Sequence, residues 1–156
     1  MTTTGTKTIT LNTNSFIGNA ATSGGSVYCD QCSWTLIKNT FTTNIGYNGG
    51  ALYIYRPTVT SITFDSTQCS SCIATNAGGC VYYSDGGTGI ATSLILNVAS
   101  GGSSTWTSNS ATNTGSGGVF YVYSSNSITM GVSSTTLTSN SAVNGGAFYL
   151  DTLGLG

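Results

Sequence analysis

A five-residue pattern, Gly-Gly-x-apolar-Tyr, occurs five times in the chain and constrains its fold more than any other feature. The copies begin at Gly24, Gly49, Gly78, Gly117 and Gly145. Successive copies start 25, 29, 39 and 28 residues apart. A period of this size is typical of solenoid proteins, in which each repeat forms one coil.

Two further registers lie upstream of each Gly-Gly pair. One is an apolar residue followed three positions later by Asn or Cys, and the other is a short alternating stretch such as Ile9-Thr10-Leu11. Alternation of apolar and small polar residues predicts strands with one buried face. We expect three inward ladders: Ile9, Trp34, Ile62, Leu94 and Ile128; Leu11, Leu36, Phe64, Leu96 and Met130; Phe16, Phe41, Cys69, Trp106 and Leu137.

One repeat is too small to bury its own apolar face, so neighbouring repeats must stack. The sequence therefore predicts an all-β fold, a single right-handed parallel β-helix of about five coils. It would occupy residues 1–156, with coils centred on the five Gly-Gly pairs. A β-sandwich would explain the alternation but not the five matching registers.

Composition narrows the function. Only 4% of the 156 residues are charged, His is absent, and the net charge is −1. Nucleic acids and anionic membrane surfaces are bound through clustered Lys and Arg, so neither is an expected partner. No apolar run reaches the length of a membrane span. No Asn begins an Asn-x-Ser/Thr sequon, which leaves O-linked sugars on Ser and Thr as the glycan class that the sequence allows.

The segments FTTNIGYNGGALY (41–53) and LTSNSAVNGGAFY (137–149) resemble the repeat of chlamydial polymorphic outer-membrane proteins and related autotransporter passengers. That family lies within the pectin-lyase-like β-helices, and the resemblance implies a surface or extracellular scaffold. The wider class includes pectate lyases and polygalacturonases, whose sites, by resemblance, need clustered Asp with Arg, Lys or His.

The charged residues of this chain do not form such a cluster in the expected coils. Counting from the repeat Tyr places Arg56 beside Asp85 on adjacent coils, with Asp30 close on the other side. Lys38 and Asp65 form the second expected pair. We interpret these as structural ion pairs. Since acid–base catalysis has no candidate, we expect no enzyme activity, catalytic residue or cofactor.

Five cysteines carry the remaining chemistry: Cys29, Cys32, Cys69, Cys72 and Cys80. The 36 residues between the two Cys-x-x-Cys pairs exceed the usual spacing of zinc knuckles, so we expect no metal site. Disulfides in an oxidising compartment are favoured over buried thiols. The expected bridges are Cys72 with Cys80 or Cys69 with Cys72. Because the number is odd, at least one thiol is free or bonded between chains.

Two columns of side chains follow from the repeat. If the apolar residues before the repeat tyrosines point inward, the tyrosines form an outward aromatic ladder. Such a ladder either docks another chain or a sugar, or only stabilises the solenoid. The Asn column is a structural turn ladder, because stacked amides hydrogen-bond along a turn. The two columns are Tyr28, Tyr53, Tyr82, Tyr121 and Tyr149, and Asn19, Asn44, Asn109 and Asn140.

The leading functional hypothesis is a structural subunit of an extracellular filament or coat. Its partner would be a second copy, stacked head to tail through the end strands, whose interface residues are Thr8, Ile9, Thr10, Leu11, Phe148, Tyr149 and Leu150. Neither end of the sequence resembles a solenoid cap, although truncation of a longer β-helix would give the same appearance.

Two alternatives remain. One is an adhesin or carbohydrate-binding module from a larger surface protein. The other is ice binding, for which Thr10, Thr35, Thr63 and Thr129 give one column that Ile95 interrupts, without a second column.

Overall fold

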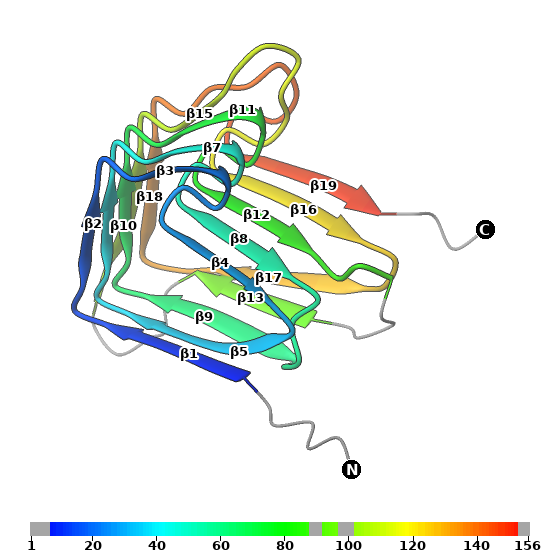
Figure 1. Cartoon of the computed structure of the whole chain (residues 1–156). Coiled ribbons are helices and arrows are strands. Elements are labelled where there is room, and N and C mark those ends of the chain that lie inside the picture. The colour runs from blue at the N-terminus through cyan, green and yellow to red at the C-terminus, as the bar shows by residue number, and fades with distance from the viewer. Residues whose placement is uncertain (1–6, 88–91, 97–101, 153–156) are drawn as a thin grey trace.

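The computed structural model describes residues 7–87, 92–96 and 102–152, and there the chain forms 19 strands, β1 to β19 (Figure 1). All pairings between these strands are parallel, and they join into four sheets stacked as a solenoid of about five coils. This confirms the predicted all-β solenoid. No helix in the described ranges is long and apolar enough to cross a membrane.

Each coil contributes one strand to each wall of the solenoid, except that the fifth coil touches sheet C only through isolated bridges. Sheet A contains β1 (Lys7–Asn12), β5 (Cys32–Ile37), β9 (Ser61–Asp65), β13 (Thr92–Leu96) and β17 (Ile128–Val132). Sheet B contains β2 (Ser15–Ile17), β6 (Thr40–Thr42), β10 (Gln68–Ser70), β14 (Ser104–Thr107) and β18 (Thr135–Thr138). Sheet C contains β3 (Ala20–Ser23), β7 (Ile45–Asn48), β11 (Ile73–Ala77) and β15 (Ser110–Ala111). Sheet D contains β4 (Val27–Asp30), β8 (Leu52–Tyr55), β12 (Val81–Ser84), β16 (Phe120–Ser124) and β19 (Phe148–Thr152).

The core runs along the solenoid axis and is filled by inward side chains of alternating positions. In sheet B the backbone register stacks Phe16, Phe41, Cys69, Trp106 and Leu137, as the repeat predicts. Phe41, Cys69 and Trp106 are fully buried, and the Trp106 ring lies 4.8 Å from that of Phe120. The core therefore joins ladders from different walls.

The predicted ladders of sheet A are wrong at the last coil. Leu94 pairs with Met130 and Thr92 pairs with Ile128, so β17 is displaced by two residues from the predicted register. A shift of two residues keeps the same side chains facing inward, and the alternation therefore cannot reveal it. The side chains of Leu94 and Leu96 lie outside the described residues.

The Gly-Gly pairs join sheet C to sheet D and are required by two different constraints. The first Gly of each pair has a positive φ between 59° and 70°, a region that favours glycine. A Cβ on the second Gly would overlap the carbonyl oxygen of the equivalent Gly in the next coil, as Gly50 would with Gly79 and Gly79 with Gly118. Close stacking of coils therefore requires the second glycine.

Candidate functional site

The Asn column forms a hydrogen-bonded ladder at the corner between sheets B and C. The residue before each corner position has a positive φ, as at Thr43 and Ser108. That turn interrupts the backbone hydrogen bonds between neighbouring coils, and the Asn side chain supplies hydrogen bonds in their place. The Oδ1 atom of Asn140 accepts from the backbone N–H of Asn109 at 2.9 Å, and its Nδ2 donates to the Trp106 carbonyl at 2.8 Å. Each amide therefore satisfies two backbone groups of the preceding coil.

The same geometry extends through the buried coils. Asn44 and Asn109 are fully buried. Asn109 accepts from the Cys72 N–H and donates to the Cys69 carbonyl, both at 3.0 Å. Cys72 occupies the Asn position of the third coil, where its sulfur accepts from Asn44 Nδ2 at 3.7 Å. The column is thus continuous despite one substitution.

A second ladder at the corner between sheets A and B was not predicted. Asn39 accepts from the N–H of Asn14 at 3.1 Å and donates to the Leu11 carbonyl at 2.9 Å. Ser104 fills the same position in the fourth coil. The spacing Leu11-x-x-Asn14 repeats that of Phe16-x-x-Asn19, and this could have revealed the ladder.

The cysteines form disulfides and leave one thiol over, as predicted, but the partners differ from the expected ones. Cys69 is bonded to Cys80, and Cys29 is bonded to Cys32, while Cys72 is a buried free thiol. The expected bridges through Cys72 are therefore replaced. Cys69 and Cys80 both point into the core, and Cys72 instead occupies the corner ladder.

A metal ion is not favoured at the three core cysteines. The sulfur atoms of Cys69, Cys72 and Cys80 lie within 4.8 Å of one another, so they could in principle share an ion. The disulfide uses two of these donors, and burial raises the pKa of the Cys72 thiol, opposing a thiolate ligand. The surrounding core is apolar, and burying several thiolate charges there would be costly.

Arg56 pairs with one of its two expected neighbours. Arg56 donates from Nε to Asp30 at 2.8 Å and forms a second contact through Nη2. This hydrogen-bonded pairing lowers the pKa of Asp30, and it is the one salt bridge among the residues with described positions. Asp30, not Asp85, is therefore the partner of Arg56.

Asp85 is fully buried and holds a turn of the fourth coil. Its carboxylate accepts from the Ser124 hydroxyl and the Ser125 N–H, both at 2.8 Å. Burial raises the pKa of Asp85, but hydrogen bonds from Gly87, Ser124 and Ser125 outweigh it, so the pKa is lowered. Arg56 and Asp85 lie on adjacent coils, but the Asp85 side chain points into the wall and that of Arg56 is partly exposed.

Lys38 and Asp65 are connected through the backbone. The N–H of Lys38 donates to the Asp65 carbonyl at 2.8 Å, while the Asp65 carboxylate accepts from the Ser66 hydroxyl at 3.0 Å. The two residues lie on neighbouring coils at the corner between sheets A and B. The predicted ion pair between the Lys38 and Asp65 side chains is therefore wrong, because the two residues meet through the backbone of this corner.

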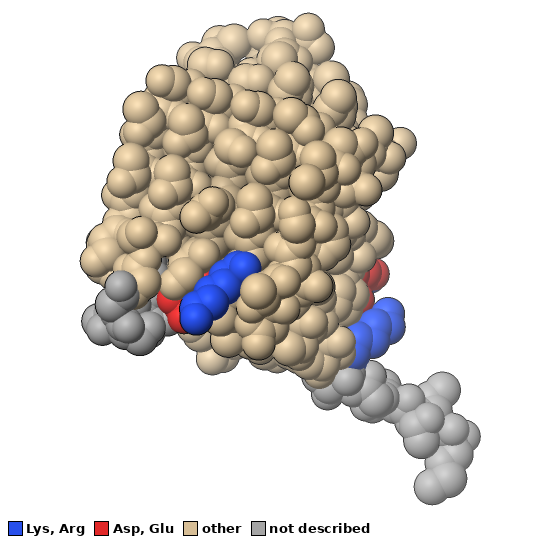
Figure 2. Space-filling view, turned by 90° about the vertical axis from the view of Figure 1, so that its left-hand side faces the viewer, with Lys and Arg blue, Asp and Glu red and all other residues tan. Residues whose placement is uncertain are grey.

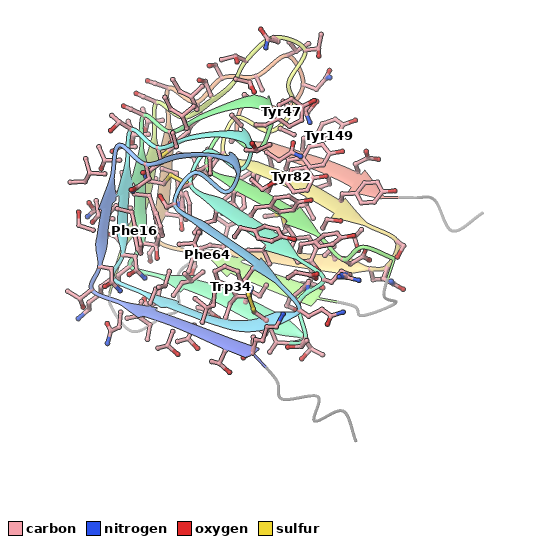
Figure 3. All side chains as sticks on the ribbon, in the orientation of Figure 1. Phe16, Trp34, Tyr47, Phe64, Tyr82 and Tyr149 are labelled. Carbon is pink, nitrogen blue, oxygen red and sulfur yellow. A yellow bond between two sulfur atoms is a disulfide. The ribbon has the colours of Figure 1, made fainter. Side chains whose placement is uncertain are left out.

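The repeat tyrosines form a continuous outward ladder on sheet D, opposite the buried Leu52, Val81 and Phe120 (Figure 3). Neighbouring ring centroids along the column from Tyr28 to Tyr149 lie 5.2, 4.6, 5.0 and 5.5 Å apart. The last two contacts are stacked, with ring planes within 16°. Burial raises the pKa of Tyr82 to about 12. The first two contacts are edge-to-face, so the rings cover each other's faces only from Tyr82 to Tyr149.

A small pocket of about 160 Å³ lies beside the ladder. Its lining comprises Asn76, Ala77, Tyr82, Thr114, Ser116 and Tyr121. It contains no charged side chain and no group capable of acid–base catalysis near neutral pH.

The outward face of sheet B carries two columns of mainly Ser and Thr side chains, interrupted by Gln68 in one column and by Ile17 at the end of the other. One column comprises Ser15, Thr40, Gln68, Thr105 and Thr136, and the other Ile17, Thr42, Ser70, Thr107 and Thr138. Figure 2 looks onto this side of the molecule, and the charged groups visible there lie along its lower part. In sheet A, by contrast, Thr35 and Thr10 are paired, but Thr129 pairs with Ser93.

The end coils differ from the middle coils in exposure. Phe41 and Trp106 are fully buried in the second and fourth coils, whereas their counterparts Phe16 and Leu137 in the end coils are partly exposed. Several apolar side chains of the end coils are only partly covered: Ile9, Leu11, Phe16 and Val27 in the first, and Ile128, Met130, Leu137 and Phe148 in the last. Leu150, whose counterpart Val122 in the fourth coil is buried, is 52% exposed. Both ends thus present core residues and strand edges.

Comparisons with family models, curated proteins and solved structures each found no match. The resemblance to polymorphic outer-membrane proteins therefore remains a resemblance of short motifs within a parallel β-solenoid of about five coils.

Proposed function

We propose that this protein is a non-enzymatic structural subunit that assembles into an extracellular filament or coat by stacking its end coils. The observation that supports the proposal is the partly uncovered core at both ends of the solenoid. In all four sheets the first coil supplies one edge strand. The last coil supplies the opposite edge in sheets A, B and D and extends sheet C through single bridges.

Stacking a second copy would pair these edges in parallel, as the coils already pair within the chain. β17 would meet β1, β18 would meet β2, and β19 would meet β4. Such a contact uses different surfaces on the two copies and does not close, so it propagates as a filament. The scarcity of charge agrees, since charged side chains are a common means of blocking edge strands.

Location outside the cell is part of the proposal. Two disulfides support an oxidising compartment, in which such bonds persist. A catalytic role has no support from the charged residues, because Asp30 and Asp85 are each held by structural hydrogen bonds. Each repeat tyrosine packs against its neighbours in the column, which favours a structural ladder over a sugar-binding platform.

The test is assembly of the purified chain, measured by sedimentation and negative-stain electron microscopy. We expect fibres of stacked subunits above a critical concentration. Thr10→Pro and Leu150→Lys should each abolish them while the circular dichroism of the monomer is retained. The N–H of Thr13 donates to the Ile37 carbonyl in the second coil. Because N–H groups alternate in direction along a strand, the N–H of Thr10 points toward the open edge, where proline would remove it. Fibres unchanged in both variants would mean that assembly uses the lateral faces.

A second candidate function is ice binding, favoured by the Ser and Thr hydroxyls of the two outward columns of sheet B, although Gln68 and Ile17 interrupt them. Strands of a solenoid are about 4.8 Å apart, and alternate residues are roughly 6.6 Å apart, so the hydroxyls form a regular array. Among the described residues, no side-chain hydrogen bond occupies the hydroxyls of Thr40, Thr105 and Thr107. Thermal hysteresis that is lost in Thr107→Lys but kept in Thr35→Lys on sheet A would support this candidate. A wild-type protein without hysteresis would eliminate it.

A further inference from the structure

The two ends of the Asn ladder lack complementary groups. At the first coil, Asn19 donates its N–H and its Nδ2 to Asn44 Oδ1, at 2.9 and 3.0 Å. Its own Oδ1 accepts no hydrogen bond from another described residue. At the last coil, the side chain of Asn140 is fully used by the fourth coil. Its backbone N–H donates to no described residue.

We infer that subunits join in one register, with Asn140 of one copy under Asn19 of the next; this rests on the proposed end-to-end assembly. In that register the Asn140 N–H donates to Asn19 Oδ1, as the Asn109 N–H donates to Asn140 within the chain. Asn19 Nδ2 then donates to the Leu137 carbonyl, as Asn140 Nδ2 donates to that of Trp106. The partner is a second copy of this chain, and the junction repeats the coil-to-coil contact.

Other columns continue through the same register. Tyr149 meets Tyr28, which is 48% exposed, and Leu137 meets Phe16. A slip of one residue would turn the apolar side chains outward. A slip of two residues would keep the alternation but would separate Asn140 from Asn19. The ladder therefore determines the register where the alternation alone would not.

The glycine column provides a selective test. A Cβ on Gly25, Gly50, Gly79 or Gly118 would overlap a carbonyl oxygen of the next coil, so alanine at these positions would disturb the monomer. At Gly146 the nearest atom to such a Cβ is the Asn140 oxygen at 3.2 Å, and its φ is not in the left-handed region. That contact is tight and is relieved by a shift of a few tenths of an ångström, whereas the Gly25 carbonyl of an incoming copy would be overlapped outright. Gly146→Ala should therefore block the junction at a small cost to the fold.

The experiment compares wild type, Gly146→Ala and a control, Val143→Ala, whose exposed side chain lies in the same coil outside the strands. Gly146→Ala should keep the circular dichroism and, nearly, the urea midpoint of the wild-type monomer. Its critical concentration for assembly should rise about tenfold to a hundredfold, the effect of one methyl group in a filled contact. Val143→Ala should assemble as wild type does.

Cross-linking tests the register directly. One copy carries Ile17→Cys and another carries Thr138→Cys, because β18 of one subunit would lie against β2 of the next. Oxidation of mixed fibres should link these two copies, and Thr136→Cys, two residues away along β18, should not replace Thr138→Cys. Links between two Ile17→Cys copies would instead mean head-to-head contacts.

The outcomes separate the two proposals. A wild-type chain that stays monomeric at every concentration overturns both the assembly and the junction. Fibres that form equally well with Gly146→Ala, or that link through Thr136→Cys, overturn the register and leave the assembly standing.

Discussion

Removing the side-chain amide of Asn109 should destabilise the protein far more than the same change at Asn19. In Asn109→Ala the buried Cys72 N–H loses its partner, whereas the Cys69 carbonyl loses one bond and stays paired with β14. An unsatisfied buried N–H costs about 1–3 kcal/mol, and the lost bond to the carbonyl adds about 1 kcal/mol. We therefore expect the free energy of unfolding to fall by about 3 kcal/mol, a large part of the stability of a typical domain.

Asn19→Ala is the matched control, because it removes the same side chain from the same column. Asn19 is exposed, its Oδ1 is unused within the described chain, and water can replace its one amide contact. The expected loss is below about 1 kcal/mol. Since Asn19 belongs to the proposed junction, both variants are compared below the concentration at which fibres form.

The assay is urea unfolding followed by circular dichroism, with the midpoint compared at equal slope. If Asn109→Ala leaves too little folded protein, Asn109→Asp gives a second measurement. Asn109→Asp keeps the acceptor oxygen but places a carboxylate in a buried site. The stability of this variant relative to wild type should therefore increase as the pH falls and the carboxyl becomes neutral. Equal losses for Asn109→Ala and Asn19→Ala would refute the view that the ladder's buried amides stabilise the coils.

Three further results are expected. A thiol reagent should modify no cysteine in the native protein, one after unfolding without reduction, namely Cys72, and five after reduction; a native count above zero would contradict its burial. The stability should be nearly constant from about pH 5 to 9, because His is absent. The stability should fall in acid, because Asp30 and Asp85 have lowered pKa values in the folded protein and take up protons on unfolding. It should also fall above about pH 10, because a tyrosine ionises there in the unfolded chain, whereas folded Tyr82 has a pKa of about 12. Calorimetry across this pH range checks both limits. A stability maximum narrower than this plateau would contradict the assignment of the two limits to these Asp and Tyr residues. Arg56→Ala should lower the free energy of unfolding by less than about 1 kcal/mol, because the ion pair is partly exposed; a larger loss in urea titrations would show that its contact with the Tyr55 ring is also important.

Local chemistry explains the features that could be predicted from the sequence. Alternation along a strand decides which side chains face inward, and the repeat of Gly-Gly and Phe-x-x-Asn marks where the chain turns. These constraints act within a few residues and are the same in every coil. The number of coils, the buried ladder through Phe41 and Trp106, and the Asn column were therefore predictable.

The remaining features depend on how coils of different length come together. The register of β17 against β13 follows from strand pairing after an insertion, and a two-residue shift leaves the alternation unchanged. The partner of Arg56 depends on which way side chains leave the corners, where positive φ values interrupt the alternation. The same holds for the cysteines: sequence spacing made Cys72 a plausible partner for Cys80, but the corner turns Cys72 into the amide ladder and leaves Cys69 facing Cys80 across the core. Repeat chemistry thus determined the coil, and tertiary packing decided which side chains meet between coils.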